Sequence, residues 1–198
     1  MGLRRTVEPV ADAITITTAK KQCEIASTDT AHDVQLQRFI AAAVRDVERH
    51  TGRALCTQTW ELTLSEFPAC PILLPRPPFQ SVTSIQYVDS NGDTQTLSSS
   101  LYAASTESPS VLQPVYGQVW PTTQPGTRAA VTITYVAGFG PDSTYIPPEY
   151  QSLLAELVLF RFGPGRGDVV NADIPKHIRA QLQALRCGVS LGSYGVRR

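Results

Sequence analysis

The segment from residue 30 to residue 67 constrains the fold most, because it joins a predicted helix directly to a predicted strand. Thr30 and Asp33 resemble a capping box at the start of the helix, and Gly52 can end it in the left-handed conformation. Between these ends, apolar residues recur at the spacing of one helical face: Leu36, Phe39, Ile40, Ala43, Val44 and Val47. This spacing predicts an amphipathic helix with one buried face over residues 30–51.

The hydrophobic period then changes from about 3.6 residues to about two. Trp60, Leu62 and Leu64 alternate with polar residues until Pro68 ends the run, which predicts a half-buried strand. Residues 71–78 contain four prolines, which favours a short edge strand followed by an extended linker. Clusters of β-branched and aromatic residues predict three more strands, at 82–88, 94–97 and 131–136.

Turn-forming residues dominate the rest of this region. Asn91 and Gly92 favour a hairpin turn between the strands at 82–88 and 94–97, since that pair tolerates positive φ angles. Residues 98–125 are rich in Ser, Thr and Pro, so we expect short strands and loops there. The hydrophobic anchors expected within that segment are Tyr102, Val111, Leu112, Tyr116 and Trp120.

Two further helices are predicted toward the C-terminal end. The first, at residues 147–162, starts at two prolines and is apolar nearly all round, so it should be the central buried helix. The second, at 174–187, has Asp173 as its cap, Pro175 in its first turn and Gly188 at its end. Its predicted buried seam comprises Ile174, Ile178, Leu182 and Leu185.

These elements predict an α+β fold, in which a small helical bundle carries an inserted antiparallel β-rich subdomain. The bundle helices lie near residues 30–51, 147–162 and 174–187. We expect an N-terminal arm and bundle helices over 1–56, the insertion over 57–140, the C-terminal helices over 141–187 and a flexible tail over 188–198.

The first residues give a weaker pattern. Residues 1–7 are predicted to form a flexible arm. Beyond them two interpretations remain open: a short helix at 19–23 capped by Thr17 or Thr18, or a strand through Ile14 and Ile16.

Charge and hydropathy exclude several classes of protein. Lys plus Arg and Asp plus Glu both number 17, so the net charge is zero and gives no bulk attraction to nucleic acid or membrane. Only 17% of residues are charged, which suits a surface that is mostly covered by partners. No run approaches the roughly 20 apolar residues of a membrane span. We therefore expect a soluble protein that is made in a cytoplasm and has no membrane partner.

The cysteines and histidines predict neither a metal site nor a cofactor. Cys23, Cys56, Cys70 and Cys187 lie far apart and form no C-x-x-C pair, and no histidine stands beside them at metal-ligand spacing. We expect reduced thiols with a structural role.

Three motifs could suggest an enzyme, and each lacks its required surroundings. Residues 188–192 match G-x-S-x-G, but a helix precedes Ser190 and no Asp, Glu or His follows it. The glycine-rich residues 163–167 lack the Gly-Lys-Ser/Thr ending of a phosphate loop. Glu149 and Glu156 share one helix face, where an acidic pair usually meets solvent or an arginine. The sequence therefore predicts that the protein is not an enzyme.

Four runs of sequence, in their order, carry a resemblance that extends from Glu8 to Leu185. They are TGRALCTQTWELTLSEFP, LPRPPFQSVTSIQYVDSNGDTQTL, YGQVWPTT and VTITYVAGFG. In these runs the chain resembles the head-to-tail connector (adaptor) proteins of tailed bacteriophages, particularly the branch with a β-rich insertion between its helices.

The resemblance implies a structural role in the neck of a virion, after assembly in the host cytoplasm. Such proteins form a ring, typically twelvefold, below the portal protein at the capsid vertex, and they give a docking platform for the tail or its stopper. DNA passes non-specifically through the channel of the ring. The implied partners are thus the portal protein, a stopper or tail-completion protein, further copies of the chain and the passing DNA.

The resemblance also implies roles for two groups of residues. The C-terminal region commonly docks onto the portal, which assigns portal binding to Leu191, Tyr194, Val196, Arg197 and Arg198. The basic residues Lys176, Arg179 and Arg186 could face the channel or its DNA, although a solvated helix face is the simpler interpretation. A DNA-binding packaging accessory is the alternative function.

Overall fold

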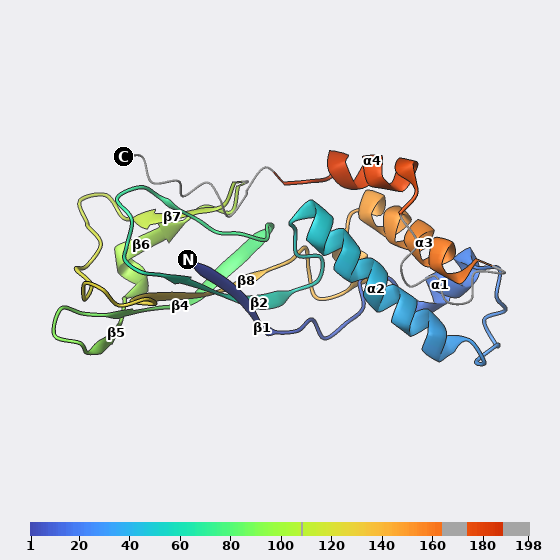
Figure 1. Ribbon diagram of the computed structural model, residues 1–198, viewed down its shortest axis with the longest axis horizontal. Coiled ribbons are helices and arrows are strands. Elements are labelled where there is room, and N and C mark those ends of the chain that lie inside the picture. Colours follow the sequence, from blue (N-terminus) through green and yellow to red (C-terminus); the bar gives the residue numbers. More distant parts are fainter. Residues whose placement is uncertain (108, 164–173, 188–198) are drawn as a thin grey trace. The chain divides into compact units, whose positions relative to one another are not determined.

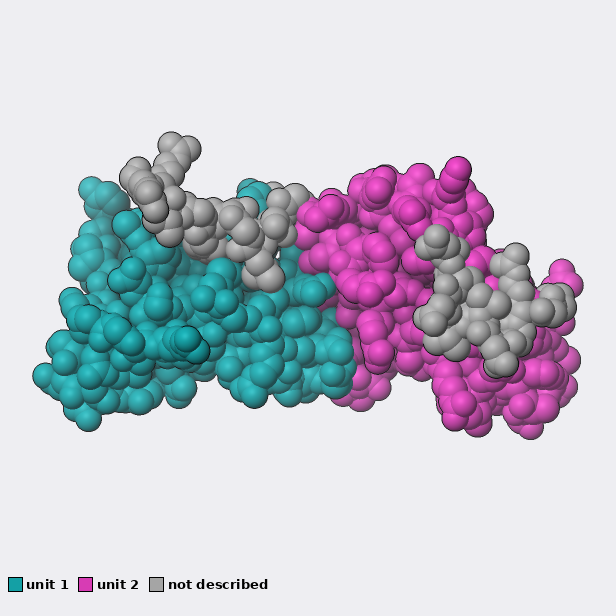
Figure 2. Space-filling model, in the orientation of Figure 1, with its two compact units in different colours: residues 1–8, 57–138, 188–198 teal, residues 9–56, 139–187 magenta. Residues whose placement is uncertain are grey.

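The computed structural model describes residues 1–107, 109–163 and 174–187, and the chain divides into two compact units (Figures 1 and 2). Among the described residues, the strand-rich unit comprises Met1–Glu8 and Thr57–Gly138, and the helical unit comprises Pro9–Cys56 and Phe139–Cys187. The predicted α+β fold with an antiparallel β-rich insertion is confirmed. In these ranges no helix has both the length and the apolar character to cross a membrane.

The helical unit contains four helices in the described ranges: α1 (Ile16–Gln22), α2 (Asp33–Thr51), α3 (Pro148–Phe162) and α4 (Lys176–Ala184). Helix α3 packs against each of the other three, as predicted for the central helix. Its buried side chains include Leu153, Leu154, Leu157 and Val158, whereas Leu159 is 38% exposed. The predicted apolar face of α2 is also buried, through Leu36, Ile40, Ala43 and Val47.

The two ends of α2 differ in how well the sequence predicted them. Gly52 ends the helix with φ of 72° and donates its amide to the Glu48 carbonyl, as predicted. The predicted capping box is wrong, because α2 begins at Asp33 and Thr30 precedes the N-cap. The Asp33 carboxylate lies 2.6 Å from Lys20 Nζ of α1. It therefore forms an ion pair with another helix and does not cap its own.

Both shorter helices differ from their predicted boundaries. Helix α1 confirms the helical alternative over the strand, but its cap is Thr15, which accepts from the Thr18 amide at 3.2 Å. The predicted caps Thr17 and Thr18 are wrong, because both lie inside the helix. Helix α4 ends at Ala184. It stops there because the Cys187 amide donates to the Thr51 carbonyl at 2.8 Å, which takes the chain across to the end of α2. The predicted cap Asp173 and stop Gly188 lie outside the described residues.

The strand-rich unit contains two antiparallel sheets. The five-stranded sheet has the order β1 (Gly2–Val7), β2 (Gln58–Leu64), β8 (Val131–Ala137), β4 (Phe79–Val88) and β5 (Thr94–Thr96). The three-stranded sheet has the order β3 (Ile72–Leu73), β7 (Val111–Pro114) and β6 (Tyr102–Ala104). The described residues also form two short 3-10 helices, η1 (Ser99–Leu101) in the strand-rich unit and η2 (Ser143–Tyr145) in the helical unit.

The N-terminal residues correct the sequence prediction. Residues 1–7 were expected to form a flexible arm of the bundle, but β1 pairs with β2 at the edge of the five-stranded sheet. Leu3 lies opposite Leu62, and the Arg4 guanidinium meets the Glu61 carboxylate at 3.0 Å. The pairing comes from a strand more than 50 residues away, so no local pattern could predict it.

The turn between β4 and β5 forms where the Asn-Gly pair predicted it. Gly92 adopts φ of 93°, and the Asp89 carboxylate accepts hydrogen bonds from the amides of Asn91 and Asp93 at 2.9 and 3.1 Å. The Gln95 side chain donates to the same carboxylate at 2.9 Å. These bonds, first of all the one from Gln95, hold the pKa of Asp89 below its ordinary value.

We expect Asp89→Ala to lower stability near neutral pH and to lose this effect in acid. Because its folded-state pKa is lowered, Asp89 stabilises the fold above its ordinary pKa, and this contribution disappears as pH falls through the lower folded-state value. Urea midpoints of the wild type and the variant, measured from neutral to acidic pH, should converge. A difference that stays constant with pH would contradict the assignment.

Candidate functional site

The predicted basic residues lie on or beside α4. Lys176 and Arg179 are exposed and separated by three positions on the helix, and Arg186 is exposed beyond its end. Ile178 and Leu182 are buried on the opposite side, and Ile174 and Leu185 are half-buried, which confirms the predicted seam. The structure thus brings two of the three basic residues to one side of α4.

The neighbouring histidine is engaged within the helical unit. His177 Nε2 lies 2.8 Å from Glu156 Oε1 of α3, so this pair links α4 to α3. Glu156 therefore pairs with a histidine and not with the expected arginine or solvent, whereas Glu149 is exposed to solvent at the start of α3, as expected. Two exposed cations on one helical turn supply general attraction to phosphate but no base recognition.

The predicted portal-binding residues lie outside the described part of the chain. These are Leu191, Tyr194, Val196, Arg197 and Arg198. Ser190 of the G-x-S-x-G match lies there too. Within the described residues, no group of His, Cys, Asp and Glu could hold a metal ion.

The four cysteines carry reduced thiols, but they do not share one environment. Cys56 and Cys187 are buried and Cys23 is half-buried, in keeping with a structural role. Burial, with a smaller contribution from Glu48, raises the pKa of Cys56 to about 11, so this thiol is protonated and a poor nucleophile. Cys70 is exposed, which contradicts the structural role expected for it.

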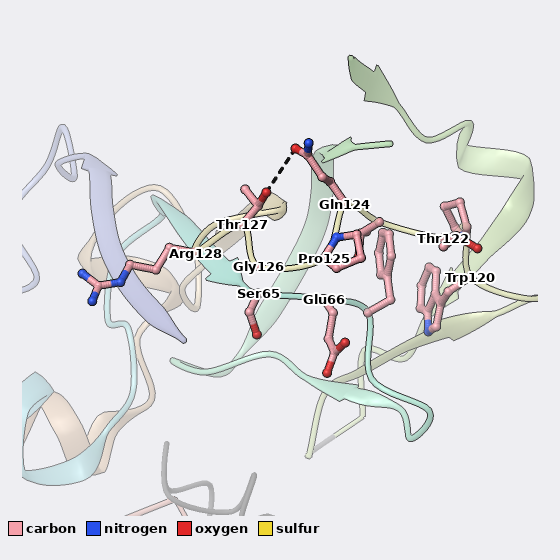
Figure 3. Close-up of a pocket in the computed structure, with 12 residues that line it drawn as sticks. Ser65, Glu66, Trp120, Thr122, Gln124, Pro125, Gly126, Thr127 and Arg128 are labelled. Carbon is pink, nitrogen blue, oxygen red and sulfur yellow. Dashed lines mark hydrogen bonds between the residues drawn. The ribbon is translucent and has the colours of Figure 1, made fainter. Parts of the chain in front are cut away.

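The strand-rich unit carries a hollow of about 630 Å³ beside an aromatic stack (Figure 3). Phe67 and Trp120 stack at 4.7 Å between ring centroids, with an angle of 8° between their planes, and Tyr87 meets the edge of Phe67 at 5.9 Å. The hollow is lined by the segment from Ser65 to Phe67 and by the segment from Trp120 to Arg128.

One backbone hydrogen bond and one side-chain hydrogen bond hold the wall of this hollow formed by residues 120–128. The Gln124 amide donates to the Val88 carbonyl at 3.1 Å, which ties the wall to the end of β4. Thr127 Oγ1 donates to Gln124 Oε1 at 3.2 Å, and Gly126 takes φ of 79° at the turn. These two bonds and the turn at Gly126 set the path of the loop that forms the wall.

The chemistry of this hollow suits a side chain of another protein better than it suits catalysis. In Figure 3 Pro125 lies near the centre, with Trp120 to its right and Glu66 below it. The Arg128 side chain extends to the left, away from these three residues. The lining offers aromatic and proline surface with hydroxyl and carboxylate groups at its margin, but it has no cysteine, histidine or lysine. Its hydroxyl groups therefore have no histidine in the lining to act as their base.

The stack also borders a second hollow of about 730 Å³. Phe67 and Trp120 line both hollows, and the second is completed by residues 68–71 and 113–119. The two aromatic residues therefore contribute to two concave surfaces of the strand-rich unit.

Comparisons with known proteins support the fold. No protein-family model and no curated protein matches this chain. Among solved structures, the chain is similar to one in the virion of a native gene transfer agent particle, with 21% identity and a TM-score of 0.77. It is also similar to one in the neck of the empty particle, computed with sixfold symmetry, with 21% identity and a TM-score of 0.78. A chain in the neck of the native particle, computed with twelvefold symmetry, gives 22% identity and a TM-score of 0.68.

Each of these matches covers 97% of this chain and 98% of the other. The shared feature is the fold. At this coverage the likeness includes residues of both the helical and the strand-rich unit.

Sequence reasoning also missed the hollow. Trp120 was predicted as an anchor, but its partner Phe67 lies 53 positions earlier, and nothing in either segment indicates the other. Tyr116 was predicted as a hydrophobic anchor too, and this prediction is wrong because the residue is fully exposed. Pro121 and Pro125 were the one local indication of a restricted loop in the segment that lines this hollow.

Proposed function

We propose that this chain is a structural head-to-tail connector (adaptor) in the neck of a tailed phage or phage-like particle. The observation that carries the proposal is the end-to-end likeness of its fold to chains of gene transfer agent particles, two of them from the neck. The sequence resemblance to phage connector proteins supports the same role independently. In this role the chain binds other proteins and does no chemistry.

The proposed assembly is a ring of twelve copies below the portal. The twelvefold and sixfold symmetries under which the similar neck structures were computed support this number. A closed ring of identical chains needs two different, mutually complementary patches on each copy, because a head-to-tail contact repeats by rotation. The ring would provide the docking platform for the tail or its stopper.

The C-terminal residues are the proposed contact with the portal protein. We expect deletion of residues 188–198 to abolish attachment to portal-bearing heads, since Leu191, Tyr194 and Val196 are the apolar anchors and Arg197 and Arg198 the charged ends of this segment. Co-sedimentation of the truncated and full-length proteins with heads measures the effect. Circular dichroism should show unchanged secondary structure, because the strands and helices described above lie before residue 188.

A matched pair of variants separates the apolar anchors from the charged ends. Leu191→Ser with Tyr194→Ser should release the protein from heads at any salt concentration, whereas Arg197→Ala with Arg198→Ala should weaken attachment mainly at low salt. If the truncated chain co-sediments with heads as well as the full chain does, the portal assignment is wrong.

The exposed cations of α4 are the proposed lining of the channel. Lys176 and Arg179, with Arg186 nearby, would contact DNA phosphates without reading sequence. The alternative function, a DNA-binding packaging accessory, differs in one measurable way: it requires a salt-dependent gel shift of duplex DNA by the isolated chain. Attachment to portal with no such shift supports the connector.

A further inference from the structure

A turn beside the second hollow presents an exposed tyrosine at its tip. The Val115 carbonyl accepts from the Gln118 amide at 2.9 Å, and Gly117 takes φ of 80°, so residues 115–118 form a closed turn with Tyr116 at its first inner position. Tyr116 is fully exposed and Val119 is 86% exposed. Three large apolar side chains, those of Val115, Tyr116 and Val119, thus stand in water within five residues.

Both ends of this turn are anchored to the strand-rich unit. On one side the Val115 amide donates to the Leu101 carbonyl at 3.1 Å, directly after β7. On the other side Trp120 stacks on Phe67. An anchored turn loses little conformational entropy when it binds, and tyrosine has only two side-chain torsions to restrict. These properties are typical of an anchor residue at a protein interface.

The hollow of Figure 3 has the chemistry to receive such a residue. Pro125 and Trp120 offer flat apolar surface to an aromatic ring, and the exposed Glu66 carboxylate can accept a hydrogen bond from a phenolic hydroxyl. Its volume of about 630 Å³ leaves space for Tyr116 together with the neighbouring Val119. The turn lines the second hollow, which shares Phe67 and Trp120 with the first.

We propose that the Tyr116 turn of one copy docks in the Ser65–Phe67 and Trp120–Arg128 hollow of the adjacent copy. This proposal rests on the proposed function, because it identifies one contact between adjacent copies of the ring. A second copy is the chosen occupant because a ring needs a projecting and a receiving patch on the same chain, and the strand-rich unit carries one of each.

A photo-crosslinker at the tip of the turn tests this contact directly. Tyr116→benzoylphenylalanine is made in the full-length chain, and isotopically heavy and light chains are mixed before assembly. We expect a crosslink between a heavy and a light peptide, with the acceptor within residues 65–67 or 120–128. The control is Tyr145→benzoylphenylalanine, since Tyr145 is a 59% exposed tyrosine of the helical unit and should give no crosslink to that hollow.

A pair of double variants measures the strength of the contact. Tyr116→Ser with Val119→Ser should weaken association between copies at least about tenfold, as expected for loss of an interface anchor. The matched control is Val10→Ser with Val34→Ser, which removes two exposed apolar side chains from the helical unit. Mass photometry over a concentration series gives the association of each variant, and circular dichroism confirms that each is folded.

The outcomes separate this contact from the proposed function. Crosslinks to the portal, to a tail protein or to another surface of the chain would contradict the proposed contact. An assembled ring in which no crosslink forms between copies would contradict it too. The connector role would stand in those cases, provided that the chain still co-purifies with particles. If the chain is absent from particles, the connector role fails, and crosslinks in concentrated solutions of the chain alone still decide the contact.

Discussion

Ile133→Ala is expected to lower the free energy of unfolding of the strand-rich unit by about 3 kcal/mol. Ile133 lies in β8, between Leu62 of β2 and Ile85 of β4 in the register of the five-stranded sheet. All three side chains are completely buried. Removing the methyl and methylene groups at the centre of this row loses their burial and leaves a cavity that neighbours on paired strands fill only partly.

The two tryptophans make this prediction easy to measure. Trp60 and Trp120 both belong to the strand-rich unit, so tryptophan fluorescence during urea unfolding reports on that unit. Thr134→Ala is the matched control on the adjacent position of β8, whose side chain is half-buried on the other face, and it should cost less than about 1 kcal/mol. Equal shifts of the urea midpoint for the two variants would contradict the proposed sheet core.

Gly140→Ala is expected to destabilise the helical unit by about 3 kcal/mol, through overpacking. A Cβ atom at Gly140 would lie 2.3 Å from both Cβ and Cγ of Tyr145. These atoms are close to the backbone of η2, so rotation of the tyrosine ring cannot relieve the overlap. Gly140 also bridges Cys56, which limits how far its own backbone can move.

Far-UV circular dichroism during urea unfolding measures this effect, because the helices dominate that signal. Gly163→Ala is the matched control at the C-cap of α3, where the nearest atom to an added Cβ is the Leu159 carbonyl oxygen at 3.7 Å. This substitution should change stability by less than about 0.5 kcal/mol. A Gly140→Ala variant as stable as the Gly163→Ala variant would show that the chain path around Tyr145 is different.

The sequence predicted best the elements whose pattern is long and local. Helix α2 and strands β2 and β8 were found because burial of one face repeats with a regular period over many residues. Helix α3 was found because a long apolar run follows two prolines. Gly52 and the turn at Asn91 and Gly92 were found because positive φ angles select particular residues.

The features that the sequence could not supply depend on residues distant in the chain. Asp33 looked like a capping residue until its partner Lys20 was placed beside it. Residues 2–7 form a strand because β2 offers them an open edge, and their own pattern is too short to show it. The hollow exists because Phe67 and Trp120 stack across two separate loops.

The candidate binding surfaces also divide into one that a local pattern predicts and one that it does not. Lys176 and Arg179 could be placed on one side of α4 because helical spacing alone decides it. Tyr116 was predicted as a hydrophobic anchor of a segment of short strands and loops. In the structure it is fully exposed, and the proposed contact between copies depends on that exposure.

Electron microscopy of particles made with and without this chain tests its connector role most directly. If the chain is the proposed connector, a producer that lacks it should yield filled or empty heads and separate tails that fail to join. Complementation with the full-length chain should restore joined particles. Particles that lack the chain and still carry normally attached tails would contradict the account.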